Sequence, residues 1–444
     1  MDLGMLLSVS AAEAQEATNT VAVVGLGKIG LPLAAQFAAK GWHVIGCDVD
    51  PAVVDAVNRG ASHINEEAGL EEAVATAHKA GLLRAVVDAA EAVRDARTVV
   101  VIVPLMVDGE GRTDFRNLDA ATAAITSGLQ RGTLVIYETT LPVGTTRGRI
   151  APMVEEGSGL KRGSDFLLAF SPERIYAGRI FEDLRKYPKI VGGIDAASTE
   201  RAVQFYKSVL DAEVWPVENA ETAEFTKLAE TTYRDVNIAL ANQLAMFGAA
   251  RDVNVTQAFK AANSQPFSHL HKASIGVGGH CIPVYPRFLL NDAKDGEMEL
   301  VRLSRMINDG MAAVSVDRLE RVLGGLEDKR VLVLGASYRE DVKEMAFSTA
   351  IPVVELLHRR GAHVLINDPL YEPGELASFE AEFVDLDRDL NVDAVVIQAF
   401  HHQYRSLDWT RFHGLKVVLD GRGALDPAAV TKTGARYLAV GLPD

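Results

Sequence analysis

The stretch that decides the fold is Val21 to Asp50, "VAVVGLGKIGLPLAAQFAAKGWHVIGCDVD". Its first apolar run, Val21 to Val24, is followed by three glycines in a G-x-G-x-x-G pattern and then by a helix-like stretch that ends near Gly41. A second apolar run ends at Asp48. This order of strand, glycine turn, helix and strand is typical of a βαβ unit that binds a dinucleotide.

Each residue of the glycine turn has a physical task. Gly25 permits the tight turn, Gly27 lets a pyrophosphate approach the backbone, and Gly30 lets the helix pack closely on the strand. The helix that begins here offers free N–H groups and the positive end of its dipole to the phosphates. We therefore expect the cofactor to contact Gly25, Gly27, Lys28, Ile29 and Gly30.

The acid that ends the second apolar run selects the cofactor. Asp48 lies about 20 residues beyond the glycines, where a carboxylate accepts hydrogen bonds from both ribose hydroxyls. The same carboxylate repels a 2′-phosphate, so the sequence predicts NAD rather than NADP. A glycine-rich turn without a ligand is the alternative, and the flanking strand, helix and acid argue against it.

More apolar runs alternate with helical stretches as far as residue 217. They include "TVVVIVPL", "TLVIYETT", "FLLAFSPE" and "KIVGGI". Continuous apolar strands separated by helices predict a parallel sheet that is covered on both faces. Ligands bind such sheets at the carboxyl ends of the strands, where Asp48, Pro104, Thr140 and Glu173 fall. We interpret residues 20–217 as an NAD-binding Rossmann domain.

A long helix is expected next. Residues 219–251 contain no proline and one late glycine, Gly248, and residues 299–323 form another helical run. A helix of this length is too long for one small domain, so we expect it to connect two domains and to pack against a second subunit. Residues 218–325 are therefore interpreted as a central helical region that makes a homodimer.

The strand–turn–helix pattern restarts in residues 326–444. "RRGAHVLINDP" (359–369) echoes "AKGWHVIGCDV" (39–49), but "GASYRE" stands where the glycine fingerprint would be. Arg339 and Arg422 follow apolar runs and could bind phosphate through their side chains, although solvated surface arginines would look the same. The predicted fold is α/β, with two Rossmann-like doubly wound parallel-sheet domains joined by a long central helix.

Composition limits the partners and the location. The net charge of −15 argues against nucleic acid or an anionic membrane, and no run approaches the roughly 20 apolar residues of a membrane span. Two cysteines make neither a disulfide framework nor a zinc site, so we expect no metal and a reducing cytoplasm. Residues 1–19 have a short apolar run and an acidic Asp2, so we interpret them as a flexible extension rather than a signal peptide.

The sequence resembles the UDP-glucose/GDP-mannose dehydrogenase family. The matching motifs occur in the family's order and cover nearly the whole chain after residue 20: "GLGKIGLPLA", "ETTLPVGTT", "SPERI", "TKLAETTYRDVNIALANQLA", "GVGGHCIPV" and "VVLDGRG". The resemblance implies oxidation of the C6 alcohol of a nucleotide-linked sugar to a carboxylate with two NAD. It also implies two Rossmann-like domains and a dimer built on the central helix.

The resemblance also assigns catalytic residues. Cys281, in a glycine-rich loop, is expected to be the nucleophile that forms a thiohemiacetal and then a thioester, whereas Cys47 lies in an apolar run and is expected to be inert. Lys227 is expected near C6 as a cation for the oxyanion or as a proton acceptor. Glu173 would act as base for the hydrolytic water, and Thr140 would position that water and touch the cofactor. A solvated lysine and a strand-end threonine are the plain alternatives.

The substrate residues follow in the same way. The resemblance places seven residues at the sugar nucleotide: Glu173, Lys227, Thr231, Lys272, Gly278, Arg339 and Arg422. Several positions depart from the family's usual pattern, and among them Thr231 replaces an asparagine and Tyr285 replaces an aspartate. The aspartate tunes the cysteine and lysine in the family, so this exchange changes how the thiol is activated.

Three substrates and one inactive alternative remain open at this point. "TYRDVNIALAN" and "GGHCIPV" favour the branch that acts on UDP-N-acetylhexosamines such as UDP-N-acetyl-D-mannosamine. UDP-glucose is the second candidate and GDP-mannose the third. A catalytically silent nucleotide-sugar-binding protein is favoured by Thr231 and Tyr285, and the retained Cys281, Lys227 and Glu173 argue against it.

Overall fold

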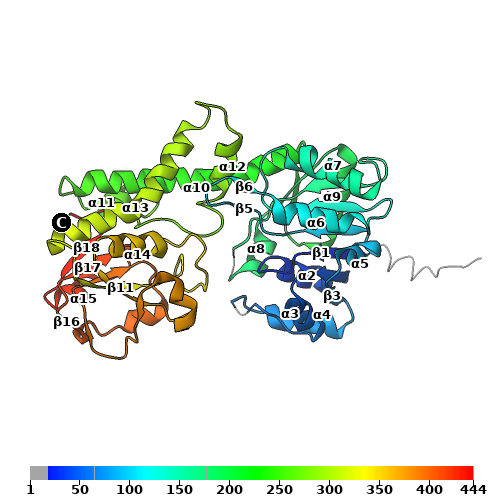
Figure 1. The fold of residues 1–444 in the computed structure, drawn as a ribbon. Helices are drawn as coiled ribbons and strands as arrows, with labels where there is room; N and C mark the ends of the chain where they lie inside the picture. The colour runs from blue at the N-terminus through cyan, green and yellow to red at the C-terminus, as the bar shows by residue number, and fades with distance from the viewer. Residues whose placement is uncertain (1–18, 65, 177, 444) are drawn as a thin grey trace, which may run out of the picture. The chain divides into compact units, whose positions relative to one another are not determined.

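The computed structural model describes residues 19–64, 66–176 and 178–443. These residues form two compact units, which divide between Ala229 and Glu230 (Figure 1). The expected N-terminal extension lies outside the described residues except for Asn19.

An eight-stranded sheet forms the centre of the first unit. Its strands lie in the order β10-β9-β8-β7-β4-β1-β2-β3. Their bounds are β1 (Thr20–Val24), β2 (His43–Cys47), β3 (Leu83–Val86), β4 (Thr98–Val101), β7 (Leu134–Tyr137), β8 (Leu167–Phe170), β9 (Lys189–Gly193) and β10 (Val214–Pro216). Strands β1, β4 and β7 are buried along their whole length, as their continuous apolar sequences predict.

Helices of the first unit flank this sheet. The unit also contains a short hairpin, which is a separate two-stranded sheet. The helices are α2 (Gly30–Ala39), α3 (Pro51–Asn58), α4 (Leu70–Lys79), α5 (Ala89–Arg94), α6 (Arg116–Thr126), the π-helical turn η1 (Thr146–Ile150), α7 (Ala151–Ser158), α8 (Ile180–Lys186) and α9 (Ala196–Val209). The hairpin pairs β5 (Met106–Val107) with β6 (Thr113–Asp114). The chain order on the sheet changes direction between β1 and β4, where doubly wound sheets bind ligands.

Two strands, β9 and β10, depart from the predicted parallel sheet, since β10 pairs parallel with β9. Strand β9 pairs antiparallel with β8, with Phe170 opposite Gly192 and Ala169 opposite Gly193. The reversal brings Lys189, the first residue of β9, to the edge of the sheet where β7 and β8 end. Ion pairs with two buried carboxylates there, described below, stabilise this direction.

A six-stranded parallel sheet forms the centre of the second unit. Its order is β13-β12-β11-β15-β17-β18. The strands are β11 (Arg330–Leu334), β12 (His363–Asn367), β13 (Glu382–Phe383), β15 (Ala394–Ile397), β17 (Val417–Asp420) and β18 (Arg436–Ala439), and β14 (Leu390–Asn391) pairs separately with β16 (Phe412–His413). The helices around it are α14 (Ala350–Arg359), α15 (Pro427–Thr431) and the short 3₁₀ turns η2 (Pro373–Phe379), η3 (His402–Ser406) and η4 (Trp409–Arg411).

The turn after β11 lacks the form of a dinucleotide turn. The buried Asp368 carboxylate accepts hydrogen bonds from the N–H groups of Ala336 and Ser337 at 2.8 and 3.0 Å. His401 Nε2 lies 3.0 Å from the same carboxylate oxygen. The protein's own carboxylate therefore takes the N–H of Ser337, which stands where the first turn has Gly27.

The predicted long helix is confirmed. Helix α10 (Ala220–Ala249) runs for 30 residues, and α11 (Val255–Ala262), α12 (Tyr285–Asp292) and α13 (Glu299–Leu323) follow it. Figure 1 shows α13 beside the later part of α10. The buried Arg305 of α13 pairs with Asp235 of α10 at 2.6 Å, and Asn242 donates to Asn308 at 3.0 Å.

Candidate active site

The glycine turn has the geometry that its sequence predicts. Gly25 has a φ of +95°, and a Cβ on it would lie 2.5 Å from the carbonyl oxygen of Ile102. A Cβ on Gly30 would lie 1.8 Å from the carbonyl oxygen of Gly25, so this helix start packs directly on the turn. A Cβ on Gly27 would meet nothing within 4 Å. Of the three glycines, Gly27 therefore leaves its backbone open to a ligand.

The surroundings of the turn fit NAD. Asp48 follows β2 and accepts the Leu26 N–H at 2.8 Å, which fixes its carboxylate beside the turn. Helix α2 has Ile29 as its N-cap, without a side-chain acceptor for its first amides. The N-terminus of this helix presents the positive end of its dipole to an incoming anion. Lys28 lies 4.0 Å from Glu66 in an exposed pair, so the turn also carries a cation.

Three further predicted residues follow neighbouring strands of the same sheet. Pro104 comes after β4, Thr140 after β7 and Glu173 after β8, and these strands are adjacent in the sheet. Because their carboxyl ends meet at one edge, these residues share that edge with the glycine turn and Asp48. Thr140 is buried, and its neighbour Thr139 donates to the Val103 carbonyl at 2.7 Å, which links the β4 and β7 loops.

Glu173 belongs to a buried charged cluster that sequence reasoning missed. Lys189 Nζ lies 2.7 Å from Glu173 Oε2 and 2.7 Å from Glu138 Oε2, and Tyr206 donates its hydroxyl to Glu138 Oε1 at 2.6 Å. The N–H groups of Arg174 and Ile175 donate to Glu173 Oε1. The signal was available in "YETT" and "PKIVGG", since a charged residue inside each apolar run needs a partner.

The pKa values of the two carboxyl groups in this cluster are shifted in opposite directions. Burial raises the pKa of Glu138 to about 7 despite the nearby Lys189. Burial alone would also raise the pKa of Glu173, but Lys189 and the hydrogen bonds to its carboxylate hold that pKa below its ordinary value. Of the pair, Glu173 is therefore the carboxyl group that is held in its ionised form, and Glu138 is the one that titrates near neutral pH.

The two cysteines have opposite environments. Cys47 is buried at the end of β2, and burial raises the pKa of its thiol to about 12. Cys281 is exposed in the loop before α12. Its carbonyl accepts the Tyr285 N–H at 2.9 Å, which connects the loop to the first turn of that helix. Of the two thiols, Cys281 is the one that a ligand can reach.

Glycines let the cysteine loop lie against its own unit. A Cβ on Gly278 would meet the carbonyl oxygen of Phe347 at 2.5 Å, and one on Gly279 would meet the ring of Tyr338 at 2.8 Å. The N–H of Gly279 donates to the Ala346 carbonyl at 2.9 Å. The loop between β11 and α14 therefore occupies the space that side chains at Gly278 and Gly279 would need, and it packs directly against the cysteine loop.

The predicted phosphate-binding arginines have different environments. Arg422 is half-buried, and its guanidinium donates to three backbone carbonyls, those of Gly276 (2.9 Å), Tyr338 (3.3 Å) and Gln398. Arg339 donates to the Tyr338 hydroxyl at 3.0 Å. Burial lowers the pKa of Arg422 to about 10, which leaves it charged at neutral pH. Arg422 thus fixes the start of the cysteine loop at Gly276.

The remaining predicted residues divide between the units. Lys272 is exposed and donates to the Gly423 carbonyl at 2.8 Å, one residue from Arg422. Lys227 and Thr231 are both buried and lie one helical turn apart on α10. Lys227, Thr140 and Glu173 belong to the first unit, whereas Cys281, Thr231, Lys272, Gly278, Arg339 and Arg422 belong to the second.

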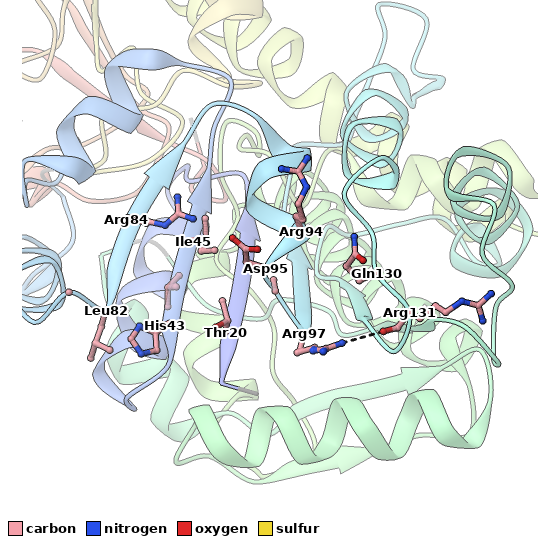
Figure 2. Close-up of a pocket in the computed structure, with 13 residues that line it drawn as sticks. Thr20, His43, Ile45, Leu82, Arg84, Arg94, Asp95, Arg97, Gln130 and Arg131 are labelled. Atoms are coloured by element: carbon pink, nitrogen blue, oxygen red, sulfur yellow. Dashed lines mark hydrogen bonds between the residues drawn. The ribbon is translucent and has the colours of Figure 1, made fainter. Parts of the chain in front are cut away.

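A separate hollow lies at the opposite edge of the first sheet. Its volume is about 760 Å³, and Thr20 and His43, where β1 and β2 begin, line it (Figure 2). Figure 2 shows several arginines around it, among them Arg97, which donates to the Arg131 carbonyl at 3.3 Å. Because β1 and β2 begin there and the glycine turn and Asp48 follow their other ends, this hollow is not part of the candidate active site.

Comparisons with known proteins identify the family of this chain. Two Rossmann-like units, of which the first carries the dinucleotide turn, define the class as a dinucleotide-binding α/β protein. Residues 19–210 match the NAD binding domain of the UDP-glucose/GDP-mannose dehydrogenase family, residues 221–310 its central domain and residues 332–427 its UDP binding domain. The chain belongs to this family and is an NAD-dependent nucleotide-sugar dehydrogenase.

Individual relatives cover almost the whole chain. A UDP-N-acetyl-D-mannosamine dehydrogenase of Pyrococcus horikoshii is 34% identical over 412 residues, which are 91% of this chain and 96% of that protein. A solved UDP-D-ManNAc dehydrogenase structure from the same organism has a TM-score of 0.87 at 31% identity and covers 95% of this chain and 99% of its own. A UDP-glucose dehydrogenase structure from Pyrobaculum islandicum has a TM-score of 0.84 at 29% identity and covers 96% and 98%.

Proposed function

We propose that this protein oxidises the C6 hydroxyl of a UDP-N-acetylhexosamine, such as UDP-N-acetyl-D-mannosamine, to a carboxylate in two steps. The observation that carries the proposal is the exposed Cys281 in its glycine-rich loop, in contrast to the buried Cys47. The similarity to UDP-N-acetyl-D-mannosamine dehydrogenases supports the substrate. NAD supplies the oxidising power by accepting a hydride from C6 in each oxidation.

The residues of this chain would bind and protect the reacting carbon. Cys281 adds as a thiolate to the C6 aldehyde and forms a thiohemiacetal, so the aldehyde cannot escape. Oxidation of that adduct gives a thioester. Lys227, buried on α10, stabilises the negative charge that develops on the C6 oxygen. Glu173, with Thr140 at the same edge of the sheet, orients the water that releases the acid.

The binding residues belong to the same proposal. The open backbone at Gly27, the acceptor Asp48 and the neighbouring Lys28, Ile29 and Pro104 would hold NAD. Substrate would be held by Lys272, Gly278, Thr231, Arg339 and Arg422 in the second unit. The matched family domains support a division into residues 20–217, 218–325 and 326–444.

The location proposed is the cytoplasm, because catalysis by Cys281 needs a reduced thiol and both cysteines of the chain are free. In the part of the chain that the structure describes, no helix is both long enough and apolar enough to span a membrane.

Two other functions have specific support. The TM-score of 0.84 to a UDP-glucose dehydrogenase is close to the 0.87 found for the UDP-D-ManNAc enzyme, so the fold does not separate these substrates. Thr231 and Tyr285 stand where the family usually has an asparagine and an aspartate, which favours a silent nucleotide-sugar-binding protein. No carboxylate stands at position 285. The Tyr285 ring instead packs on Phe288, with 5.6 Å between the ring centroids.

One assay separates these functions. The protein is incubated with NAD and each of UDP-N-acetyl-D-mannosamine, UDP-glucose and GDP-mannose, and NADH formed per sugar consumed is counted. We expect two NADH per sugar and a uronic acid product, at the highest kcat/KM with the N-acetylated sugar. Binding of all three sugars without NADH would support the silent protein, and preference for UDP-glucose would correct the substrate.

The covalent step has its own test. Cys281→Ser should slow turnover profoundly or stall at an ester-like adduct, because at neutral pH a serine hydroxyl is a poorer nucleophile than a thiolate, and its alkoxide is a poorer leaving group. Intact-protein mass spectrometry would detect the adduct, and Cys47→Ser is the matched control that should retain activity. Near-normal turnover by Cys281→Ser would remove this cysteine from the mechanism.

A further inference from the structure

We propose that Lys189, held by Glu138 and Tyr206, is the positioning residue that orients the Glu173 carboxylate for thioester hydrolysis. This inference rests on the proposed function and deepens its last step. Nothing in the sequence motifs assigns a role to Lys189, Glu138 or Tyr206. All four residues belong to the first unit, and their contacts lie within it.

The topology of the sheet creates the contact. In the antiparallel β8–β9 ladder, Phe170 faces Gly192 and Ala169 faces Gly193. Continued past Phe170, the same register places Glu173 opposite Lys189. A parallel β9 would have put Lys189 at the amino edge of the sheet, away from the predicted chemistry. The reversed strand therefore delivers a cation to the carboxyl edge, where Glu173 lies.

The contacts fix both oxygens of the Glu173 carboxylate. Oε2 receives the ammonium of Lys189 at 2.7 Å, and Oε1 receives the N–H groups of Arg174 at 2.6 Å and Ile175 at 3.1 Å. A carboxylate held at both ends has one orientation. Oε1 already accepts two hydrogen bonds, whereas Oε2 accepts one and can accept another, so the carboxylate can direct a water without turning toward it.

Lys189 is itself fixed from the other side. Its ammonium also lies 2.7 Å from Glu138 Oε2, and its Nζ lies 5.0 Å from the centroid of the Tyr206 ring. Tyr206 donates its hydroxyl to Glu138 Oε1 at 2.6 Å. The Lys189, Glu138 and Tyr206 side chains are buried, so solvent does not loosen the arrangement.

Charge balance decides which carboxyl group of the cluster carries the negative charge. Two carboxyl groups share one ammonium, and burial disfavours a second negative charge. Burial raises the pKa of Glu138, whereas Lys189 and the hydrogen bonds to its carboxylate lower the pKa of Glu173, so the shared ammonium favours the negative charge on Glu173. The carboxylate that is predicted to act on water is therefore the one that the cluster keeps ionised.

This arrangement serves the hydrolytic step. Glu173 accepts a proton from water as the water oxygen bonds to the thioester carbonyl carbon. The carbon–sulfur bond breaks, Cys281 leaves as its thiolate, and the sugar carboxylic acid is released. The negative charge moves from Glu173 to sulfur, so the step is balanced without another reactant. A misoriented Glu173 slows this step and leaves the two preceding oxidations intact.

The experiment isolates that step. Lys189→Met removes the ammonium at similar length, and Tyr206→Phe removes one hydroxyl. Stopped-flow measurement should show a rapid burst of NADH, up to two per active site, followed by slow turnover. We expect kcat to fall about 10- to 100-fold, less than the roughly 10²- to 10⁴-fold range for loss of an acid–base group itself. Intact-mass analysis should show a sugar acyl adduct on Cys281, and Lys189→Arg should restore part of the rate.

Controls distinguish a positioning role from a structural one. Tyr137→Phe removes another fully buried hydroxyl of the same unit, which bonds Thr122 at 2.8 Å and does not touch Glu173. It should lower the unfolding temperature about as much as Tyr206→Phe but produce no burst and no adduct. If Lys189→Met does not fold, the Tyr206→Phe and Tyr137→Phe pair decides the question.

The outcomes separate the two proposals. Folded Lys189→Met or Tyr206→Phe proteins that turn over at the unsubstituted rate without a burst would overturn the positioning role. A burst in Tyr137→Phe as large as in Tyr206→Phe would overturn it as well. Absence of NADH formation by the unsubstituted protein with every sugar would instead refute the proposed function.

Discussion

At the scale of single residues, the three glycines of the first turn have different physical roles. Gly25 and Gly30 lack a Cβ because backbone oxygens occupy that space, whereas Gly27 faces open space. A substitution at Gly27 therefore adds a methyl group to a surface that would face the pyrophosphate. A substitution at Gly30 instead forces the helix away from the turn.

Gly27→Ala and Gly30→Ala should consequently have different effects. Gly27→Ala should leave the free energy of unfolding within about 1 kcal/mol of its original value, the usual cost of glycine–alanine exchange, but raise KM for NAD. Gly30→Ala should destabilise the unit by about 1–3 kcal/mol, as overpacking does. Urea unfolding and NADH kinetics measure both quantities. Equal stability losses in the two variants would contradict this division.

At the scale of elements, the cysteine loop depends on residues from another part of its unit. Arg422 follows β17 and holds the carbonyls of Gly276, Tyr338 and Gln398. Loss of a buried partner for a carbonyl costs about 1–3 kcal/mol. The loop is therefore held by the second sheet as well as by its own glycines.

Arg422→Met should lower the free energy of unfolding by about 3 kcal/mol, since the three carbonyls are left without their shared donor. It should also increase hydrogen exchange of the Gly276–Cys281 segment. Arg422→Lys separates this role from phosphate binding, because lysine keeps the charge but cannot serve three carbonyls in one plane. If Arg422→Lys retains both loop protection and stability, the anchoring role is wrong, and a change in substrate KM alone would indicate phosphate contact.

Elements also show what could be predicted from sequence. Two features could be predicted because each leaves a local signal in the sequence. Glycine spacing and an acid at a strand end indicate the glycine turn, and the absence of proline indicates the helix expected over 219–251. The direction of β9 could not be predicted, since nothing local in its five residues specifies a direction. The partnership of Glu138 and Lys189 depends on that direction. It joins residues 51 positions apart and carries no local pattern.

At the scale of the whole molecule, α10 leaves an apolar stripe exposed. Tyr233, Leu240, Leu244 and Phe247 recur at steps of seven, four and three residues, so they share one face of the helix. Helix α13 exposes apolar side chains as well, among them Leu303 and Met306. Single exposed apolar residues are common, but a stripe along one helix face indicates an interface. We propose that this stripe is where two copies of the chain form the expected homodimer.

The dimer prediction can be tested without catalysis. Leu240→Glu with Leu244→Glu places two charges in the middle of the stripe, where burial against a second copy would cost several kcal/mol. Analytical ultracentrifugation at micromolar concentration should give a dimer for the unsubstituted protein and a monomer for the variant. Phe267→Glu is the matched control, because Phe267 is 93% exposed and lies outside α10 and α13. A monomeric unsubstituted protein, or a variant that keeps the dimer mass, would show that the stripe is not the interface.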